Sequence, residues 1–130
     1  MKTILLIDDN KDILENLTEY LEMEGYKILS ASNGKNGIEL AKQHIPHLIL
    51  CDTLMPDLDG YEVLHLLLET CKTHKIPFVF STSNSEKVDK TKAIELGADD
   101  YLIKPYDMET LAKVIQHWLK SGTNTNLLKR

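Results

Sequence analysis

Five polar side chains with the chemistry for metal binding and group transfer follow short apolar runs in this sequence. They are Asp8, Asp9, Asp52, Thr82 and Lys104. Any one polar residue at such a position is usually a loop or capping residue, but a fold that brings all five to one edge makes a site. Three crowded carboxylates repel one another unless a cation and a lysine share the space. The residue types therefore predict a divalent metal site.

Mg²⁺ is the metal that these side chains favour. Hard oxygen ligands with no cysteine or histidine nearby suit this ion, which binds one or two carboxylates and keeps several waters. An acceptor carboxylate, Mg²⁺, a lysine and a hydroxyl are also what phosphoryl transfer to an aspartate requires, because the moving oxygens need positive charge and hydrogen-bond donors. The sequence thus predicts aspartyl phosphorylation with Mg²⁺ as cofactor.

The elements that must position these residues alternate along the chain between strand-length apolar runs and segments of helical period. The predicted strands cover residues 3–7, 26–31, 47–51, 78–81 and 101–103, and the predicted helices cover 10–24, 34–43, 61–71, 86–96 and 107–120. Strict alternation with short connections is typical of a parallel sheet covered on both faces. We expect an α/β fold, a doubly wound five-stranded parallel sheet with five helices, whose ligands bind beyond the carboxyl ends of the strands.

The size and composition of the chain fit one globular domain. Its 130 residues are 42% hydrophobic and 27% charged, which excludes a disordered or disulfide-stapled class. The expected domain covers residues 1–121, with 122–130 as a polar tail or the stub of a linker. The two cysteines, Cys51 and Cys71, stand in apolar runs, and we expect both to be reduced and buried.

The net charge and the hydropathy pattern limit the partners. A formal charge of -5 is the wrong sign for a surface that binds phosphates, so direct nucleic-acid binding is not expected. No apolar run reaches membrane-spanning length, and the first residues do not form a signal peptide. We expect a cytoplasmic protein with no membrane contact.

The motifs around the five site residues resemble those of response-regulator receiver domains from two-component signalling, of the single-domain, chemotaxis-regulator-like type. They are Ile7-Asp8-Asp9, Asp52-x-x-Met55-Pro56-x-x-Asp59-Gly60, Thr82, and Lys104-Pro105. Thirty positions separate Asp52 from Thr82 and twenty-two separate Thr82 from Lys104, as in that family. The resemblance covers residues 3 to about 120 and implies a flavodoxin-like receiver fold.

The resemblance implies a role for each acidic residue. Asp52 resembles the phospho-acceptor of the family. Asp9, Asp52 and the carbonyl of Leu54 resemble direct Mg²⁺ ligands, and Asp8 resembles a carboxylate that acts through metal-bound water. The resemblance therefore places both metal binding and phosphorylation at the ends of the first and third strands.

The resemblance also implies two residues that bind the phosphoryl group and an aromatic residue that changes its orientation on phosphorylation. Lys104 and Thr82 resemble the two residues that contact phosphoryl oxygens, and Tyr101 resembles the aromatic residue whose rotation follows the state of Thr82. The Lys104-Pro105 bond is usually cis in the family. This chain departs from the family at Ser83, where most members have alanine. A local shift could therefore put a neighbouring hydroxyl in the place of Thr82.

The implied function is signalling rather than turnover. The domain would accept a phosphoryl group from a sensor histidine kinase or a phosphotransfer protein, and catalyse only its own phosphorylation and dephosphorylation. Its output would be a phosphorylation-dependent contact with a protein partner, or with a second copy of the chain. The expected face lies around Tyr101, between the predicted helices at 86–96 and 107–120.

Two other functions remain open from the residues alone. A Mg²⁺-dependent phosphohydrolase that forms an aspartyl phosphate also has an acceptor aspartate, a lysine and a threonine. Such an enzyme would carry a second acidic residue two positions after the nucleophile, where this chain has Leu54. A flavodoxin-like binding module without phosphorylation would need a phosphate-binding loop after the first strand, where Asp8 and Asp9 stand instead.

Overall fold

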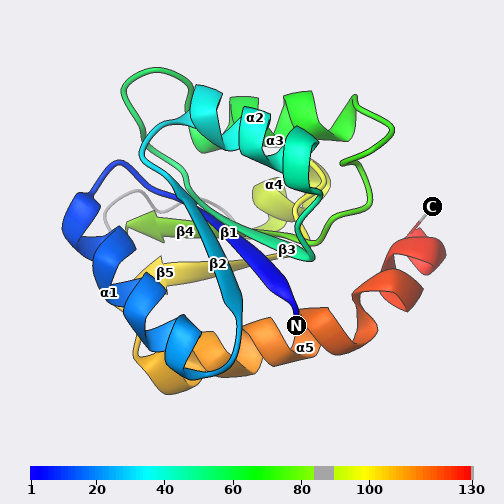
Figure 1. The fold of residues 1–130 in the computed structure, drawn as a ribbon. Coiled ribbons are helices and arrows are strands. Elements are labelled where there is room, and N and C mark those ends of the chain that lie inside the picture. The colour runs from blue at the N-terminus through cyan, green and yellow to red at the C-terminus, as the bar shows by residue number, and fades with distance from the viewer. Residues whose placement is uncertain (84–89, 130) are drawn as a thin grey trace.

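Five parallel strands form one sheet in the order β2-β1-β3-β4-β5 (Figure 1). The computed structural model describes residues 1–83 and 90–129. The strands are β1 (Thr3–Ile7), β2 (Lys27–Ala31), β3 (Leu48–Asp52), β4 (Phe78–Ser83) and β5 (Asp100–Lys104). Every neighbouring pair runs parallel, so the doubly wound α/β class predicted from the sequence is confirmed.

Helices cover both faces of the sheet. The helices are α1 (Lys11–Met23), α2 (Gly34–His44), α3 (Gly60–Leu68), α4 (Lys90–Glu95) and α5 (Met108–Lys129). Figure 1 shows α1 and α5 on one side of the sheet and α2 and α3, with α4 behind them, on the other. We call these sides the α1/α5 face and the α2–α4 face.

Alternation along the central strands divides the core into two clusters. Leu50 of β3 and Val79 of β4 belong to the cluster on the α1/α5 face. Their neighbours Cys51 and Phe80 belong to the cluster on the α2–α4 face. Successive side chains of a strand point to opposite faces, so the last residues of β3 and β4 inherit the same alternation. This assignment fixes the sides on which the site residues lie.

Side-chain caps fix the helix starts next to the strand ends. The Asn10 side chain accepts hydrogen bonds from the backbone N–H groups of Asp12 and Ile13 at the start of α1. At the start of α3, Asp59 and Glu62 form a reciprocal capping box. Such caps satisfy N–H groups that have no partner within the helix. The two helices that follow β1 and β3 therefore begin at defined residues.

Three predicted boundaries are wrong, two of them by two or three residues and the third, the end of α5, by nine. Strand β4 extends to Ser83, so Thr82 lies within the strand rather than after it. Helix α3 ends at Leu68, not residue 71. The hydroxyl of Thr73 donates to the carbonyl of Leu67 at 2.7 Å, and such side-chain donors compete with continuation of a helix. Helix α5 continues to Lys129, since no proline interrupts the segment that was expected to fray.

The two cysteines and the predicted fourth helix agree only in part with the expectations from the sequence. Cys51 is fully buried as expected, but Cys71 is exposed, because it lies in the turns after α3. The cap at Ser85 and the first residues of the predicted helix at 86–96 lie outside the described residues; α4 is seen from Lys90 to Glu95. Within the described part of the chain, no helix has both the length and the hydropathy to cross a membrane.

Candidate functional site

Three carboxylates meet where β1 and β3 end. Asp8 and Asp9 follow β1, Asp52 ends β3, and one oxygen from each lies within 4.8 Å of the others. Strands β1 and β3 are neighbours, with Ile7 paired to Cys51, which brings the carboxyl ends together. The chain passes from β1 outward to β2 on one side and returns as β3 on the other. This is the crossover point at which doubly wound sheets bind ligands.

Lys104 completes this acidic cluster from the far edge of the sheet. Its Nζ lies 2.9 Å from Oδ2 of Asp8 and 3.6 Å from Oδ1 of Asp52. Burial opposes the charged form of the lysine, but its hydrogen bond to Asp8 and the charges of Asp8 and Asp52 raise its pKa above the usual value. Lys104 therefore remains a cation and balances part of the acidic charge.

The surroundings of Asp52 oppose ionisation of its carboxyl group. Its side chain is almost buried, with a residue exposure of 8%. Burial, together with the charges of Asp8 and Asp9, raises its pKa from 3.8 to about 6, against the opposing effects of Lys104 and of a hydrogen bond from the Leu54 backbone. The carboxylate is therefore mostly ionised at pH 7, but it is more basic than an ordinary aspartate.

The cluster suits a hard divalent cation. Three carboxylates against one lysine leave two uncompensated negative charges when all are ionised. Among the residues that the structure describes, no histidine or cysteine joins the group. Oxygen-only ligands favour Mg²⁺ over softer metals. The donor set thus fits the predicted ion, while coordination by the carbonyl of Leu54 stays a prediction.

Thr82 lies beside the acidic cluster but on the other face of the sheet. Ser81 pairs with Asp52, so Ser81 shares the α1/α5 face with the carboxylate and Thr82, one residue later, shares the α2–α4 face with Phe80. Thr82 is 2% exposed. Of its two hydroxyl neighbours, Ser81 contacts the hydroxyl of Tyr106 at 3.4 Å and Ser83 is half-buried.

Thr53 is a site residue that the sequence reasoning missed. Its Oγ1 donates a hydrogen bond to Oγ1 of Thr82 over 3.1 Å, and its exposure is 1%. Thr53 follows Asp52 directly, so it connects the acidic cluster with the threonine. Its position after a strand end was a visible signal, but the sequence did not show that its side chain meets Thr82.

Tyr101 stands two strands from the acidic cluster. It lies in β5 opposite Phe80, and its half-buried ring packs against the core cluster of the α2–α4 face. Thr82 pairs with Ile103, which brings the threonine and the aromatic residue to neighbouring strands on one face. The peptide bond between Lys104 and Pro105 is cis, as the resemblance implied.

Gly60 presses the start of α3 against the end of β3. A Cβ at this position would lie 2.3 Å from the carbonyl oxygen of Asp52 and 2.9 Å from Cα of Thr53, closer than atoms can approach. The Gly60 N–H also donates to the carbonyl of Thr53 at 2.8 Å. Only glycine permits this approach, so the backbone beside the acidic cluster is held firmly.

The loop between β3 and α3 is also anchored to α2. Oδ1 of Asp57 accepts from the N–H of Gly34 at 3.1 Å, and Oδ2 accepts from the N–H of Lys35 at 3.0 Å. Burial opposes ionisation of Asp57, but backbone hydrogen bonds, including these two, together outweigh it and lower its pKa. Both oxygens of Asp57 are thus engaged in structural hydrogen bonds.

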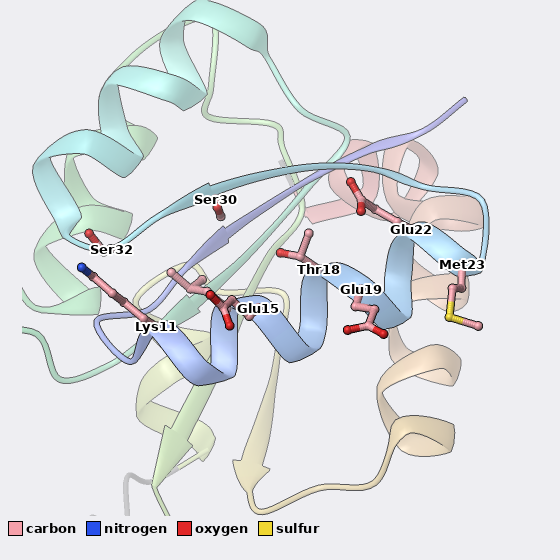
Figure 2. Close-up of a pocket in the computed structure, with 9 residues that line it drawn as sticks. Lys11, Glu15, Thr18, Glu19, Glu22, Met23, Ser30 and Ser32 are labelled. Atoms are coloured by element: carbon pink, nitrogen blue, oxygen red, sulfur yellow. The ribbon is translucent and has the colours of Figure 1, made fainter.

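A wide groove elsewhere contains no comparable chemistry. It lies between α1 and the edge strand β2, where Glu15 and Glu19 of α1 and Ser30 of β2 line it (Figure 2). None of the predicted site residues lines it. Among the described residues, the acids that could share a metal ion are Asp8, Asp9 and Asp52, which are not part of this groove. We therefore assign the chemistry to the strand ends.

The sequence is similar to known signalling proteins. Residues 4–116 match the profile of the family described as "Response regulator receiver domain". The chain is 39% identical to Protein PilH of Pseudomonas aeruginosa, an alignment covering 88% of this chain and 95% of PilH. It is 35% identical to the transcriptional regulatory protein CpxR of Escherichia coli, with 97% of this chain aligned to about half of that protein, 55%.

The fold is similar to solved receiver structures. The signal receiver domain of a histidine kinase from Syntrophus aciditrophicus has a TM-score of 0.85 and 30% identity, with 93% of this chain and 92% of that chain covered. The receiver domain of the sensor histidine kinase PA1611 from Pseudomonas aeruginosa has a TM-score of 0.84 and 27% identity, with coverages of 92% and 98%. That structure has a magnesium ion coordinated in its active-site cleft.

Proposed function

The chain belongs to the response-regulator receiver family of two-component signalling, and from this premise we propose that Asp52 accepts a phosphoryl group from the phosphohistidine of a sensor kinase or phosphotransfer protein. One observation carries the proposal. Asp8, Asp9 and Asp52 converge within 4.8 Å, with the Lys104 ammonium 3.6 Å from the proposed acceptor. This set of groups would provide a nucleophile, metal ligands and a cation at one point.

The proposed reaction is a displacement at phosphorus. An oxygen of the ionised Asp52 carboxylate forms the new bond to phosphorus, and the bond from phosphorus to the donor nitrogen breaks. The imidazole nitrogen keeps that electron pair. A pKa of about 6 makes Asp52 mostly ionised at neutral pH, while its raised basicity favours nucleophilic attack. The chain would thus catalyse only its own phosphorylation and dephosphorylation.

Asp9, Asp52 and the Leu54 carbonyl would hold Mg²⁺ directly, with Asp8 acting through bound water. When bound, the ion neutralises charge on the phosphoryl oxygens. The magnesium in the similar PA1611 receiver supports this assignment. The Lys104 ammonium already lies between Asp8 and Asp52, where it can donate to a phosphoryl oxygen on Asp52.

Thr82 and Tyr101 form the proposed switch. The Thr82 hydroxyl would turn toward the phosphoryl group, and Tyr101 would rotate into the space that it leaves. Three apolar side chains in α4, directly after it and in β5 are exposed: Ile94, Leu96 and Ile103. We expect this face to bind a protein partner or a second copy of the chain, rather than nucleic acid, with a coupling of about 1 to 3 kcal/mol. The proposed location is the cytoplasm.

Intact-protein mass spectrometry after incubation with acetyl phosphate and Mg²⁺ tests the acceptor. The expected result is one labile phosphate adduct on the wild-type chain and none on folded Asp52→Asn. An adduct that persists in Asp52→Asn would place the acceptor elsewhere. Continuous release of phosphate from small phosphate esters would instead support the phosphohydrolase, although the exposed Leu54 occupies the position where that enzyme needs a second acid.

Backbone amide NMR shifts with and without beryllofluoride test the output face. This ion adds to the acceptor aspartate in place of the phosphoryl group. The expected changes reach from Thr82 through β5 into α5. Changes confined to the loops around Asp8 and Asp52, with β5 and α5 silent, would contradict the proposed face.

A further inference from the structure

We propose that Thr53 is a positioning residue whose hydroxyl holds Thr82 in the resting position and must release it when Asp52 is phosphorylated. The inference rests on the proposed function, because it concerns the step in which Thr82 turns toward a phosphoryl group. Thr53 is not among the site residues predicted from the sequence. It is therefore an additional control on the same site.

The first argument is the side of the sheet on which the contact is made. Asp52 and its register partner Ser81 lie on the α1/α5 face by strand alternation. The Thr53–Thr82 hydrogen bond, at 3.1 Å, is formed on the α2–α4 face. Thr82 must carry its hydroxyl around the end of β4 to reach a group on Asp52. The hydrogen bond from Thr53 holds it on the side away from that group.

The second argument is that Thr53 cannot follow Thr82. The carbonyl of Thr53 accepts the Gly60 N–H at 2.8 Å, and α3 packs so closely that even one carbon on Gly60 would overlap the Asp52–Thr53 backbone. The side chain is 1% exposed, which leaves it no room to swing outward. A turn of the Thr82 hydroxyl therefore breaks the contact rather than moving both residues together.

The third argument concerns the cost of breaking it. Both hydroxyls are buried, so water does not replace the hydrogen bond between them when it breaks. A turn of Thr82 removes this hydrogen bond. The resting arrangement is thereby favoured over the switched one. Removal of the Thr53 hydroxyl should favour the switched arrangement by about three- to tenfold, the range for one net hydrogen bond.

Thr53→Val is the direct test, because valine keeps the shape and removes the hydroxyl. The measurement is the dissociation constant for beryllofluoride in the presence of Mg²⁺, followed by amide NMR shifts in the full chain. The expected result is binding three- to tenfold tighter than wild type. In the absence of beryllofluoride, the Thr82 methyl resonance of Thr53→Val should already be shifted toward its bound position.

Two further variants separate positioning from a purely structural effect. Thr53→Ser keeps a hydroxyl and should restore the wild-type dissociation constant. Thr73→Val removes another buried threonine hydroxyl, which donates to the carbonyl of Leu67 away from the site, and should lower stability without changing beryllofluoride affinity. If Thr53→Val fails to fold, Thr53→Ala carries the same expectation.

The outcomes distinguish the two proposals. Equal or weaker binding by folded Thr53→Val, with normal binding by wild type, overturns the role of Thr53 and leaves the proposed function intact. A wild-type chain that does not bind beryllofluoride at all overturns the proposed function itself.

Discussion

The site consists of a charged half and a hydroxyl half, which differ in their charge and in their hydrogen bonding. The charged half, Asp8, Asp9, Asp52 and Lys104, holds more negative charge than its lysine balances, and burial, together with the charges of Asp8 and Asp9, raises the pKa of Asp52. The hydroxyl half, Thr53 and Thr82, is buried, uncharged and internally hydrogen-bonded. The charged half is therefore suited to bind a cation and a phosphoryl group. The hydroxyl half keeps its internal hydrogen bond until Thr82 turns toward another group.

The two halves meet at one peptide bond. Asp52 and Thr53 are consecutive residues that face opposite sides of the sheet, and the start of α3 packs against the backbone between them. A change on one half can reach the other through this short segment or through movement of Thr82. Variants that act on one half alone, or on the junction, should therefore behave differently.

Gly60→Ala should have the largest effect, because Gly60 packs against the Asp52–Thr53 backbone, where the two halves meet. The new Cβ would meet the Asp52 carbonyl at 2.3 Å, so α3 or the end of β3 must move. We expect a loss of about 2 to 4 kcal/mol in the free energy of unfolding, measured by urea denaturation. Phosphorylation by acetyl phosphate should fall as well, since Asp52 is displaced.

Gly25→Ala is the matched control for Gly60→Ala. Gly25 has a φ of +97° but open space around its Cβ position, so alanine there costs only backbone strain, about 1 kcal/mol. Phosphorylation should be unchanged in this control. Equal losses of stability in the two variants would show that the close approach at Gly60 does not matter.

Asp52→Asn should stabilise the folded protein in the absence of Mg²⁺, by about 1 to 3 kcal/mol at pH 7. The folded pKa of Asp52, about 6, lies above its ordinary value of 3.8, so the folded state favours the protonated form. Wild-type stability from this group is present below pH 4 and is lost as the pH rises to about 6. Asparagine cannot ionise, so the variant should escape that loss.

The measurement is the difference in unfolding free energy between wild type and Asp52→Asn, taken in EDTA from pH 4 to pH 8. The difference should grow between pH 4 and pH 6 and then stay level. Mg²⁺ should reduce it at pH 7, because the cation relieves repulsion in the wild type. A difference independent of pH would mean that the carboxylate is not strained.

Lys104→Ala should affect the charged half in the opposite direction. Loss of the Lys104 ammonium leaves the buried carboxylate of Asp8 without the cation that lies 2.9 Å from it. In the absence of metal, this should lower the free energy of unfolding by about 1 to 2 kcal/mol. Millimolar Mg²⁺ should recover most of that loss, because lysine removal takes away no metal ligand. The response to beryllofluoride at Thr82 and Tyr101 should weaken more than Mg²⁺ binding. Thermal unfolding with and without Mg²⁺, followed by NMR titration, separates the two effects.

The sequence was sufficient to predict the charged half. Asp8 and Asp52 come at the ends of apolar runs predicted as strands, and parallel topology then brings such ends together. The convergence of Lys104 with the acids agrees with that reasoning. Polar residues at strand ends are informative because the sheet fixes their position regardless of loop shape.

The hydroxyl half was only partly predictable. Thr82 was identified by family spacing, yet it was placed after its strand because Thr82 and Ser83 are not apolar enough to indicate that the buried strand continues. The contact with Thr53 depends on the register between β3 and β4 and on the close packing at Gly60. Neither is visible in residue periodicity. For the same reason, the hydrogen bonds from α2 to Asp57 could not be predicted.

Asp57→Ala should have the smallest effect, because Asp57 anchors the loop from outside both halves. Its two carboxylate oxygens accept the N–H groups of Gly34 and Lys35 at the start of α2, an arrangement equivalent to a helix cap. Loss of a cap costs about 1 kcal/mol, and the exposed position of Asp57 keeps the cost at this level. Asp57→Asn, which keeps one acceptor oxygen, should lose less. Urea denaturation of both variants at pH 7 measures the difference.

The two loop acids, Asp57 and Asp52, should also differ in how their contributions to stability depend on pH. Backbone hydrogen bonds hold the pKa of Asp57 below its usual value, so its contribution to stability is present above pH 4 and fades as the pH falls below that range. Asp52 shows the reverse dependence, although only four residues separate the two acids from one another along the loop. Because both oxygens of Asp57 are engaged with α2, Asp57→Ala should still form the full phosphate adduct on Asp52. A reduced adduct in a folded Asp57→Ala chain would mean that the anchor of the loop, and not only the acids and Lys104, sets the position of the acceptor.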